Sequence, residues 1–241
     1  MFFGFVELIH SILVDGSNAT QAMLRSDNDV DDGGAMSALT ALLFDYITGS
    51  DADVHATVMQ FFDRLFAAVY LHRAVPPATV ECVASLRRQG EGVEIPFAGV
   101  DSSVADDLAR SARVARVFLD SLRLAGVVAR SLGDVDLGHQ CSRALTRLRY
   151  CATCEGVLET APPRPCRPFC ANVARGCLVH LVAGQTSRRW EHFVDAVNQL
   201  ALFGISGRRN LEGVLSALPK LISDEVTRLQ ANIQNYRSQV R

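Results

Sequence analysis

Six of the chain's seven cysteines lie within 37 residues, in the stretch CSRALTRLRYCATCEGVLETAPPRPCRPFCANVARGC from Cys141 to Cys177. No other feature constrains the fold as strongly, because cysteines this close together bind a metal, carry redox chemistry or form disulfides. The seventh, Cys82, lies apart from the others. An odd total leaves at least one thiol without a partner inside the chain.

The inner four cysteines have a spacing that suits a structural zinc site: Cys151, Cys154, Cys166 and Cys170. However, Cys151 continues a helical pattern, whereas zinc-binding pairs usually lie on tight polar turns. A zinc site would also leave the other three cysteines unexplained. A redox dithiol requires a helix N-terminus to lower the thiol pKa, and this CxxC pair comes at a helix end. Disulfides would account for all seven cysteines in an extracellular chain, so the zinc and disulfide interpretations both remain open.

Hydrophobic periodicity predicts an all-α fold, because helical spacing recurs along the chain and no segment alternates as a strand would. The longest predicted helix has Ser103 as its cap and a buried seven-residue repeat, with four arginines off that stripe. An acidic loop, Ser26–Gly34, separates the first two helices, and Pro219 predicts a kink or a restart in the last one. The predicted helices are Phe2–Leu13 (ended by Asp15-Gly16), Met36–Ile47, Asp53–His72, Val80–Leu86, Ser103–Leu132, Arg188–Phe203 and 211–240.

Composition and motifs exclude several classes of function. The formal net charge of −2 gives no electrostatic case for nucleic-acid binding. No apolar run is long enough to span a membrane, and the apolar start lacks the basic region of a signal peptide. The six histidines are scattered, and no catalytic or nucleotide-binding motif is present, so we expect no enzyme activity, cofactor or metal. The sequence Asn18-Ala19-Thr20 is an N-glycosylation motif, which we place on a loop after the first helix.

The cysteine stretch resembles the signature of the glypican family. The matching segments are CSRALTRLRYCATCEG, then PCRPFCANVARGCL, then Trp190 thirteen residues beyond Cys177. Flanking segments are similar to the family as well: FFGFVELIHSIL, LFDYITGSDADVHATVMQFFDRLFAAVY, ECVASL and LPKLISDEVTRLQANIQNYRSQV. The likeness covers nearly the whole chain. It implies a single glypican-like core domain over residues 1–241, truncated at both ends, with a cysteine-rich segment at 141–178.

The resemblance also implies a fold, a location and a function. Glypican cores are elongated, all-helical rods linked by disulfides. They are non-catalytic heparan sulfate proteoglycans at the outer face of the plasma membrane, held by a lipid anchor. They bind and present Wnt, Hedgehog, bone morphogenetic and fibroblast growth factors. The sugar-attachment sites and the anchor signal have no counterpart in this sequence. The alternative is an intracellular helical protein with the four-cysteine zinc site.

The family's disulfide pattern transfers only where positions match. It implies that Cys141 pairs with Cys177. It implies that the partners of the remaining cysteines lie outside this chain: Cys82, Cys151, Cys154, Cys166 and Cys170. We also expect N-glycosylation at Asn18, and an export signal in sequence that is not part of this chain.

Overall fold

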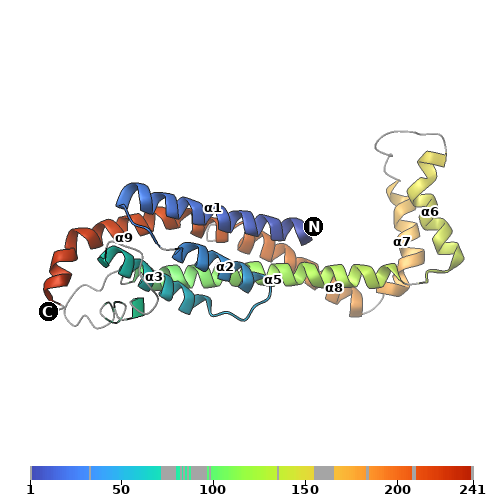
Figure 1. Cartoon of the computed structure of the whole chain (residues 1–241). Coiled ribbons are helices and arrows are strands. Elements are labelled where there is room, and N and C mark those ends of the chain that lie inside the picture. The colour runs from blue at the N-terminus through green and yellow to red at the C-terminus, as the bar shows by residue number, and fades with distance from the viewer. Residues whose placement is uncertain are drawn as a thin grey trace. The chain divides into compact units, whose positions relative to one another are not determined.

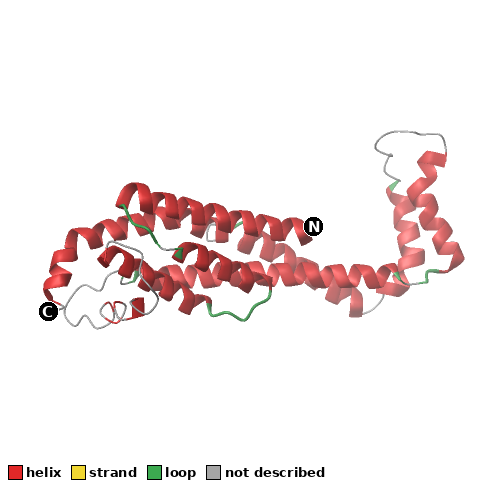
Figure 2. Ribbon diagram, in the orientation of Figure 1, coloured by secondary structure: helices red, strands yellow, loops and turns green. Residues whose placement is uncertain are grey.

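Helices make up all the regular structure in the described residues, and no strand occurs among them (Figure 2). The computed structural model describes residues 2–32, 34–71, 80, 81, 83, 85, 87, 97, 99–134, 136–154, 166–182, 185–207 and 210–239. The helices are α1 (Phe2–Asn28), α2 (Ala35–Thr48), α3 (Val54–Leu71), α5 (Val100–Gly133), α6 (Gly138–Cys154), α7 (Arg167–Val182), α8 (Gln185–Gln199), the π-helix η1 (Leu200–Ile205) and α9 (Leu211–Gln239). The prediction of an all-α fold is confirmed.

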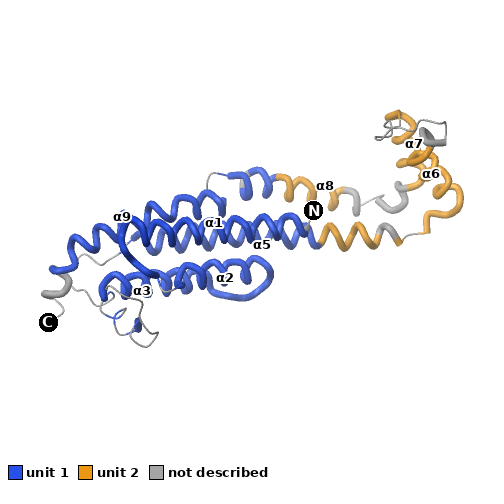
Figure 3. The backbone as a smooth tube through the Cα atoms, turned by 45° about the horizontal axis from the view of Figure 1, so that its top comes forward, with its two compact units in different colours: residues 1–123, 199–241 blue, residues 124–198 orange. Residues whose placement is uncertain are grey.

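The chain divides into two compact units (Figure 3). Unit 1 comprises residues 1–123 and 199–241, and unit 2 comprises residues 124–198. In unit 1, α1 lies beside α9, and α2 packs against both α1 and α3 (Figure 1). In unit 2, α6 and α7 pack against each other. The single-domain expectation stays a prediction.

The core of unit 1 is built from the apolar stripes of these helices. Phe62, Leu43 and Ile222 are fully buried, and each comes from a different helix. In α5, Leu108 and Ala115 of the seven-residue repeat are buried in the same core. Further along α5, the repeat reaches the exposed Ala129, which belongs to unit 2. Only the first half of the predicted stripe therefore serves as core.

The first helix is much longer than the periodicity predicts. It runs through Asp15-Gly16 and ends at Asn28, so the predicted stop after Leu13 was wrong. Gly16 is a packing position rather than a terminator, because a Cβ placed there would lie only 3.0 Å from the Cβ of Leu215 on α9. The missing side chain lets the two helices approach closely. The predicted acidic loop is correspondingly shorter, since α1 includes residues 26–28.

We predict that Gly16→Ala destabilises unit 1 by about 1–3 kcal/mol relative to Gly4→Ala, which is the matched control. Both glycines lie in α1, so replacing either one by alanine raises the helix propensity of its position by the same amount. A Cβ at residue 4 meets nothing within 4 Å, whereas one at residue 16 crowds Leu215. Urea unfolding followed by circular dichroism measures the difference. Equal midpoints for the two variants would show that α1 and α9 are not packed tightly at this position.

The other helix boundaries differ less from the expectation. α5 begins at Val100 rather than at a Ser103 cap, with Asp101 in its first turn. The preceding turn is closed by the carbonyl of Phe97, which accepts hydrogen bonds from Val100 and Asp101. α9 continues through Pro219, so the restart is wrong and the kink, the other predicted effect of Pro219, stays a prediction. The start of α5 is set by turn hydrogen bonds that the hydrophobic pattern does not reveal.

Two arginines of α5 stabilise the carboxyl end of α2. Arg123 donates to the carbonyl of Thr48 at 2.9 Å, and Arg116 donates to that of Ser50 at 2.6 Å. The Arg116 guanidinium also lies 4.9 Å from the ring centre of Tyr46. Cations are favourable at a helix C-terminus, where carbonyl groups lack helical partners. Both arginines lie off the apolar stripe, as predicted, and they join α5 to α2.

Candidate functional site

The cysteine-rich segment forms a hairpin of two antiparallel helices, α6 and α7, within unit 2 (Figure 1). Cys141 lies in the first turn of α6 and Cys177 lies eleven residues into α7. The structure joins them by a disulfide with a Cα–Cα distance of 5.4 Å across 36 residues of sequence. This distance is typical of disulfides. The bond therefore ties the two ends of the hairpin that are far from its connecting segment.

The inner cysteines all lie toward the other end of the hairpin. Cys151 and Cys154 occupy the last turn of α6, about 15 and 20 Å from Cys141 at 1.5 Å per residue. Their side chains are outside the described residues. Cys166 is exposed and Cys170 is half-buried, and neither forms a disulfide. The amide of Cys170 donates to the carbonyl of Cys166 at 3.1 Å, as a first helical turn requires. The four thiols thus come from the helix ends nearest the connection.

Cys82, whose partner is expected outside the chain, lies outside the described residues. No group of three or more potential ligands gathers around a common point in the part of the chain that the structure describes. The side chains of Cys151 and Cys154 lie outside the described residues, so the zinc alternative stays a prediction.

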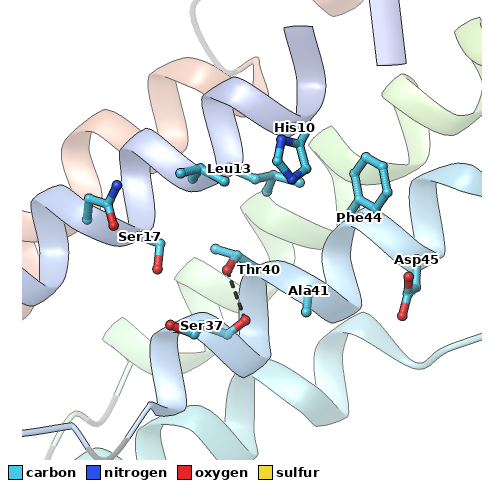
Figure 4. Close-up of a pocket in the computed structure, with 10 residues that line it drawn as sticks. His10, Leu13, Ser17, Ser37, Thr40, Ala41, Phe44 and Asp45 are labelled. Atoms are coloured by element: carbon cyan, nitrogen blue, oxygen red, sulfur yellow. Dashed lines mark hydrogen bonds between the residues drawn. The ribbon is translucent and has the colours of Figure 1, made fainter. Parts of the chain in front are cut away.

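A groove with a volume of about 380 Å³ lies between α1 and α2 in unit 1 (Figure 4). Apolar groups such as Leu13 and Phe44 line it, and the imidazole of His10 meets the Phe44 ring edge-on at 5.4 Å between ring centres. Thr40 and Ser37 supply polar atoms, but the Thr40 hydroxyl already donates to the backbone carbonyl of Ser37. The groove therefore offers mainly an apolar surface.

Asn18 also lines this groove. It lies in α1, so its predicted position on a loop was wrong, for the same reason that the stop at Gly16 was wrong. Its side chain is exposed, whereas Thr20 of the same motif is fully buried and donates to the carbonyl of Gly16 at 2.8 Å. Exposure of Asn18 is compatible with a glycan at this position. Glycosylation of Asn18 stays a prediction.

The sequence did not predict a buried cluster of ion pairs in unit 1. The Nε atom of Arg87 lies 2.9 Å from a carboxylate oxygen of Asp63, and its Nη1 donates to Asp101 at 3.0 Å. The first contact has the distance of an ion pair but not the geometry of a hydrogen bond. Arg87 is only 4% exposed. The one available signal was a charged residue, Asp63, between large apolar side chains of a predicted helix.

The acidic segment before α2 has a structural role as well. Asp32 is buried, and its carboxylate accepts hydrogen bonds from the amides of Gly34 at 3.2 Å and Met36 at 2.8 Å. A carboxylate in this position satisfies amide groups at a helix N-terminus and suits the helix dipole. Asp32 therefore stabilises the start of α2.

Among the helices that the structure describes, none combines the length and the apolar character that a membrane span requires.

Comparison with known proteins gives a consistent result. The glypican family model matches residues 32–241. Glypican-3 of Danio rerio is 32% identical over 243 residues, which span 98% of this chain and 40% of the relative. Glypican-5 of Homo sapiens is 30% identical over 201 residues, 81% of this chain and 33% of the relative. The chain thus spans two fifths or less of the length of these relatives.

Comparison of the fold with solved structures also finds a glypican. A crystal structure of C-terminally truncated glypican-1 matches with a TM-score of 0.65 at 25% identity. The match covers 99% of this chain and 56% of that one. The family model also covers the cysteine-rich segment. The sequence comparison and the fold comparison therefore indicate the same family.

Proposed function

Because the chain belongs to the glypican family, we propose that it forms part of the protein core of a cell-surface heparan sulfate proteoglycan. In this role the chain is non-catalytic, and it binds and presents secreted growth factors. The candidates are Wnt, Hedgehog, bone morphogenetic and fibroblast growth factors. The family match over residues 32–241 is the observation that carries the proposal.

The cysteine hairpin supports an extracellular location. The disulfide between Cys141 and Cys177 requires an oxidising compartment, because cytosolic thiols are kept reduced. We propose in addition that the remaining cysteines pair with residues outside this chain, and that Asn18 carries an N-glycan.

Direct binding measurements test the proposed function. The 241-residue chain, secreted from eukaryotic cells behind a heterologous signal peptide, is immobilised and exposed to each growth factor in turn. We expect saturable binding of at least one factor with a Kd below about 1 µM. A reduced and alkylated sample is the control and should bind more weakly. If no factor binds to a helical, disulfide-bonded sample, the growth-factor role of this segment is rejected.

The zinc alternative is separated by metal analysis of the same chain, purified under reducing conditions. A structural site at Cys151, Cys154, Cys166 and Cys170 would retain close to one zinc ion per chain. Non-reducing peptide mapping of the secreted protein supplies the complementary observation. A linked peptide pair containing Cys141 and Cys177, with no bound zinc, supports the extracellular assignment.

A further inference from the structure

The helical hairpin of unit 2 differs in charge from the rest of the chain. Residues 124–198 contain nine arginines and six acidic residues, a net charge of +3 in a chain whose total is −2. Helices α6 and α7 contain no acidic residue, and the segment that connects them contains two, Glu155 and Glu159. Their five arginines are all exposed: Arg143, Arg147, Arg149, Arg167 and Arg175.

These five arginines also differ in their partners from most of the described arginines of unit 1. In the described part of unit 1, five arginines form ion pairs with carboxylates: Arg87, Arg110, Arg116, Arg123 and Arg228. For the five hairpin arginines, no ion pair or hydrogen bond of the guanidinium group occurs in the described structure. No carboxylate among the described residues neutralises their charge, so it is available to an external anion.

Two of the three arginines on α6 share one face with His139 and an exposed aromatic ring. His139, Arg143, Arg147 and Tyr150 follow each other at intervals of four, four and three residues, which places them on one side of a helix. All four are exposed, and Tyr150 retains 54% of its surface. We call these four residues the α6 face. It extends over about 16 Å at 1.5 Å per residue.

The disulfide keeps this face turned toward solvent. Cys141 points toward α7, because it is bonded to Cys177. Arg143 follows Cys141 by two residues, which is a rotation of about 200° around the helix axis. The α6 face is therefore on the side opposite α7, in agreement with its exposure.

We propose that the α6 face binds a sulfated polysaccharide chain. The planar guanidinium forks of Arg143 and Arg147 match the oxygens of an anionic group in pairs, and a linear row of charges suits a linear polyanion. The Tyr150 ring offers an apolar surface on which a sugar ring packs. The choice of a sulfated sugar rests on the proposed function, because a proteoglycan core is always close to such chains. An acidic polypeptide is the competing partner, and it is tested below by competition with polyglutamate.

Heparin oligosaccharides of defined length, titrated into the full 241-residue chain without attached sugar chains, test this proposal. We expect Arg143→Gln/Arg147→Gln to weaken binding about tenfold and to lower the slope of log Kd against log salt by about 1–2. Tyr150→Ala should weaken binding a few-fold, and Tyr150→Phe should bind like the wild type. The charge-matched control is Arg25→Gln/Arg64→Gln, which removes two exposed arginines of unit 1 and should change Kd by less than about twofold.

Several results would overturn the proposal. Equal losses in the test and control pairs would mean that only net charge matters. Competition by desulfated heparin, or by polyglutamate of matched charge, as strong as that by heparin would exclude a sulfated-sugar site. Growth-factor binding by the same preparations separates this inference from the proposed function. A chain that binds growth factors but not heparin contradicts only the α6 face, and the reverse result contradicts only the growth-factor role.

Discussion

Replacing Arg87 with methionine is expected to lower the free energy of unfolding of unit 1 by about 3–5 kcal/mol. Arg87 is buried between the carboxylates of Asp63 and Asp101, at 2.9 and 3.0 Å. Without the guanidinium, two buried carboxylates lose their counter-charge, and desolvation of an unpaired charge is costly. Chemical unfolding of the secreted chain, monitored by circular dichroism, measures the change.

Arg110→Met is the control for this experiment. Arg110 forms an ion pair with Asp107 at 3.6 Å on the exposed surface of α5, where solvent screens the interaction. We expect a change within about 0.5 kcal/mol. If Arg87→Met cost no more than Arg110→Met, the cluster around Arg87 would have to be open to water. Replacing Asp63, Arg87 and Asp101 together by apolar residues should recover part of the loss, because no buried charge then remains.

Removal of the disulfide by Cys141→Ser/Cys177→Ser is expected to destabilise the α6–α7 hairpin by about 4 kcal/mol, since the bond closes a 36-residue interval. Among the described residues of unit 2, Val173 is the only apolar side chain that is buried. Loss of the bond should therefore release α6 from α7.

Hydrogen exchange of peptides from α6 and α7 follows this release directly. The double variant should exchange faster in both helices and as before in α1 and α9, which belong to unit 1. Cys166→Ser is the control, because Cys166 is exposed and forms no disulfide in the structure. Unchanged protection of α6 and α7 in the double variant would show that packing alone maintains the hairpin.

Most helices were predictable, because their signal is local. The predicted helix Met36–Ile47 differs from α2 by one residue at each end, and Asp53–His72 begins one residue before α3. Apolar residues at intervals of three and four decide such segments without knowledge of their neighbours. The predicted helix Arg188–Phe203 overlaps α8 and continues into η1, whose wider turns carry no distinct hydrophobic period.

The errors occurred where one residue type supports two different structures. Glycine ends many helices, but Gly16 allows α1 to contact Leu215, which is 199 positions further along the chain. Serine caps many helices, but Ser103 lies inside α5. In both cases the deciding contact is tertiary or lies in a turn, so a pattern read along the chain favours the commoner role. The wrong prediction that Asn18 lies on a loop followed from the first of these errors, the helix end predicted at Asp15-Gly16.

The sequence by itself determined the helical class, most helix positions and the family, because periodicity and cysteine spacing are properties of neighbouring residues. Only the tertiary structure decided where charges and close contacts lie. It placed Arg87 between two carboxylates and Gly16 against α9. It also left the α6 face exposed to solvent on the side of the hairpin away from α7. Burial and counter-charge depend on residues that are distant in sequence. A spacing pattern therefore cannot distinguish a buried arginine from an exposed one.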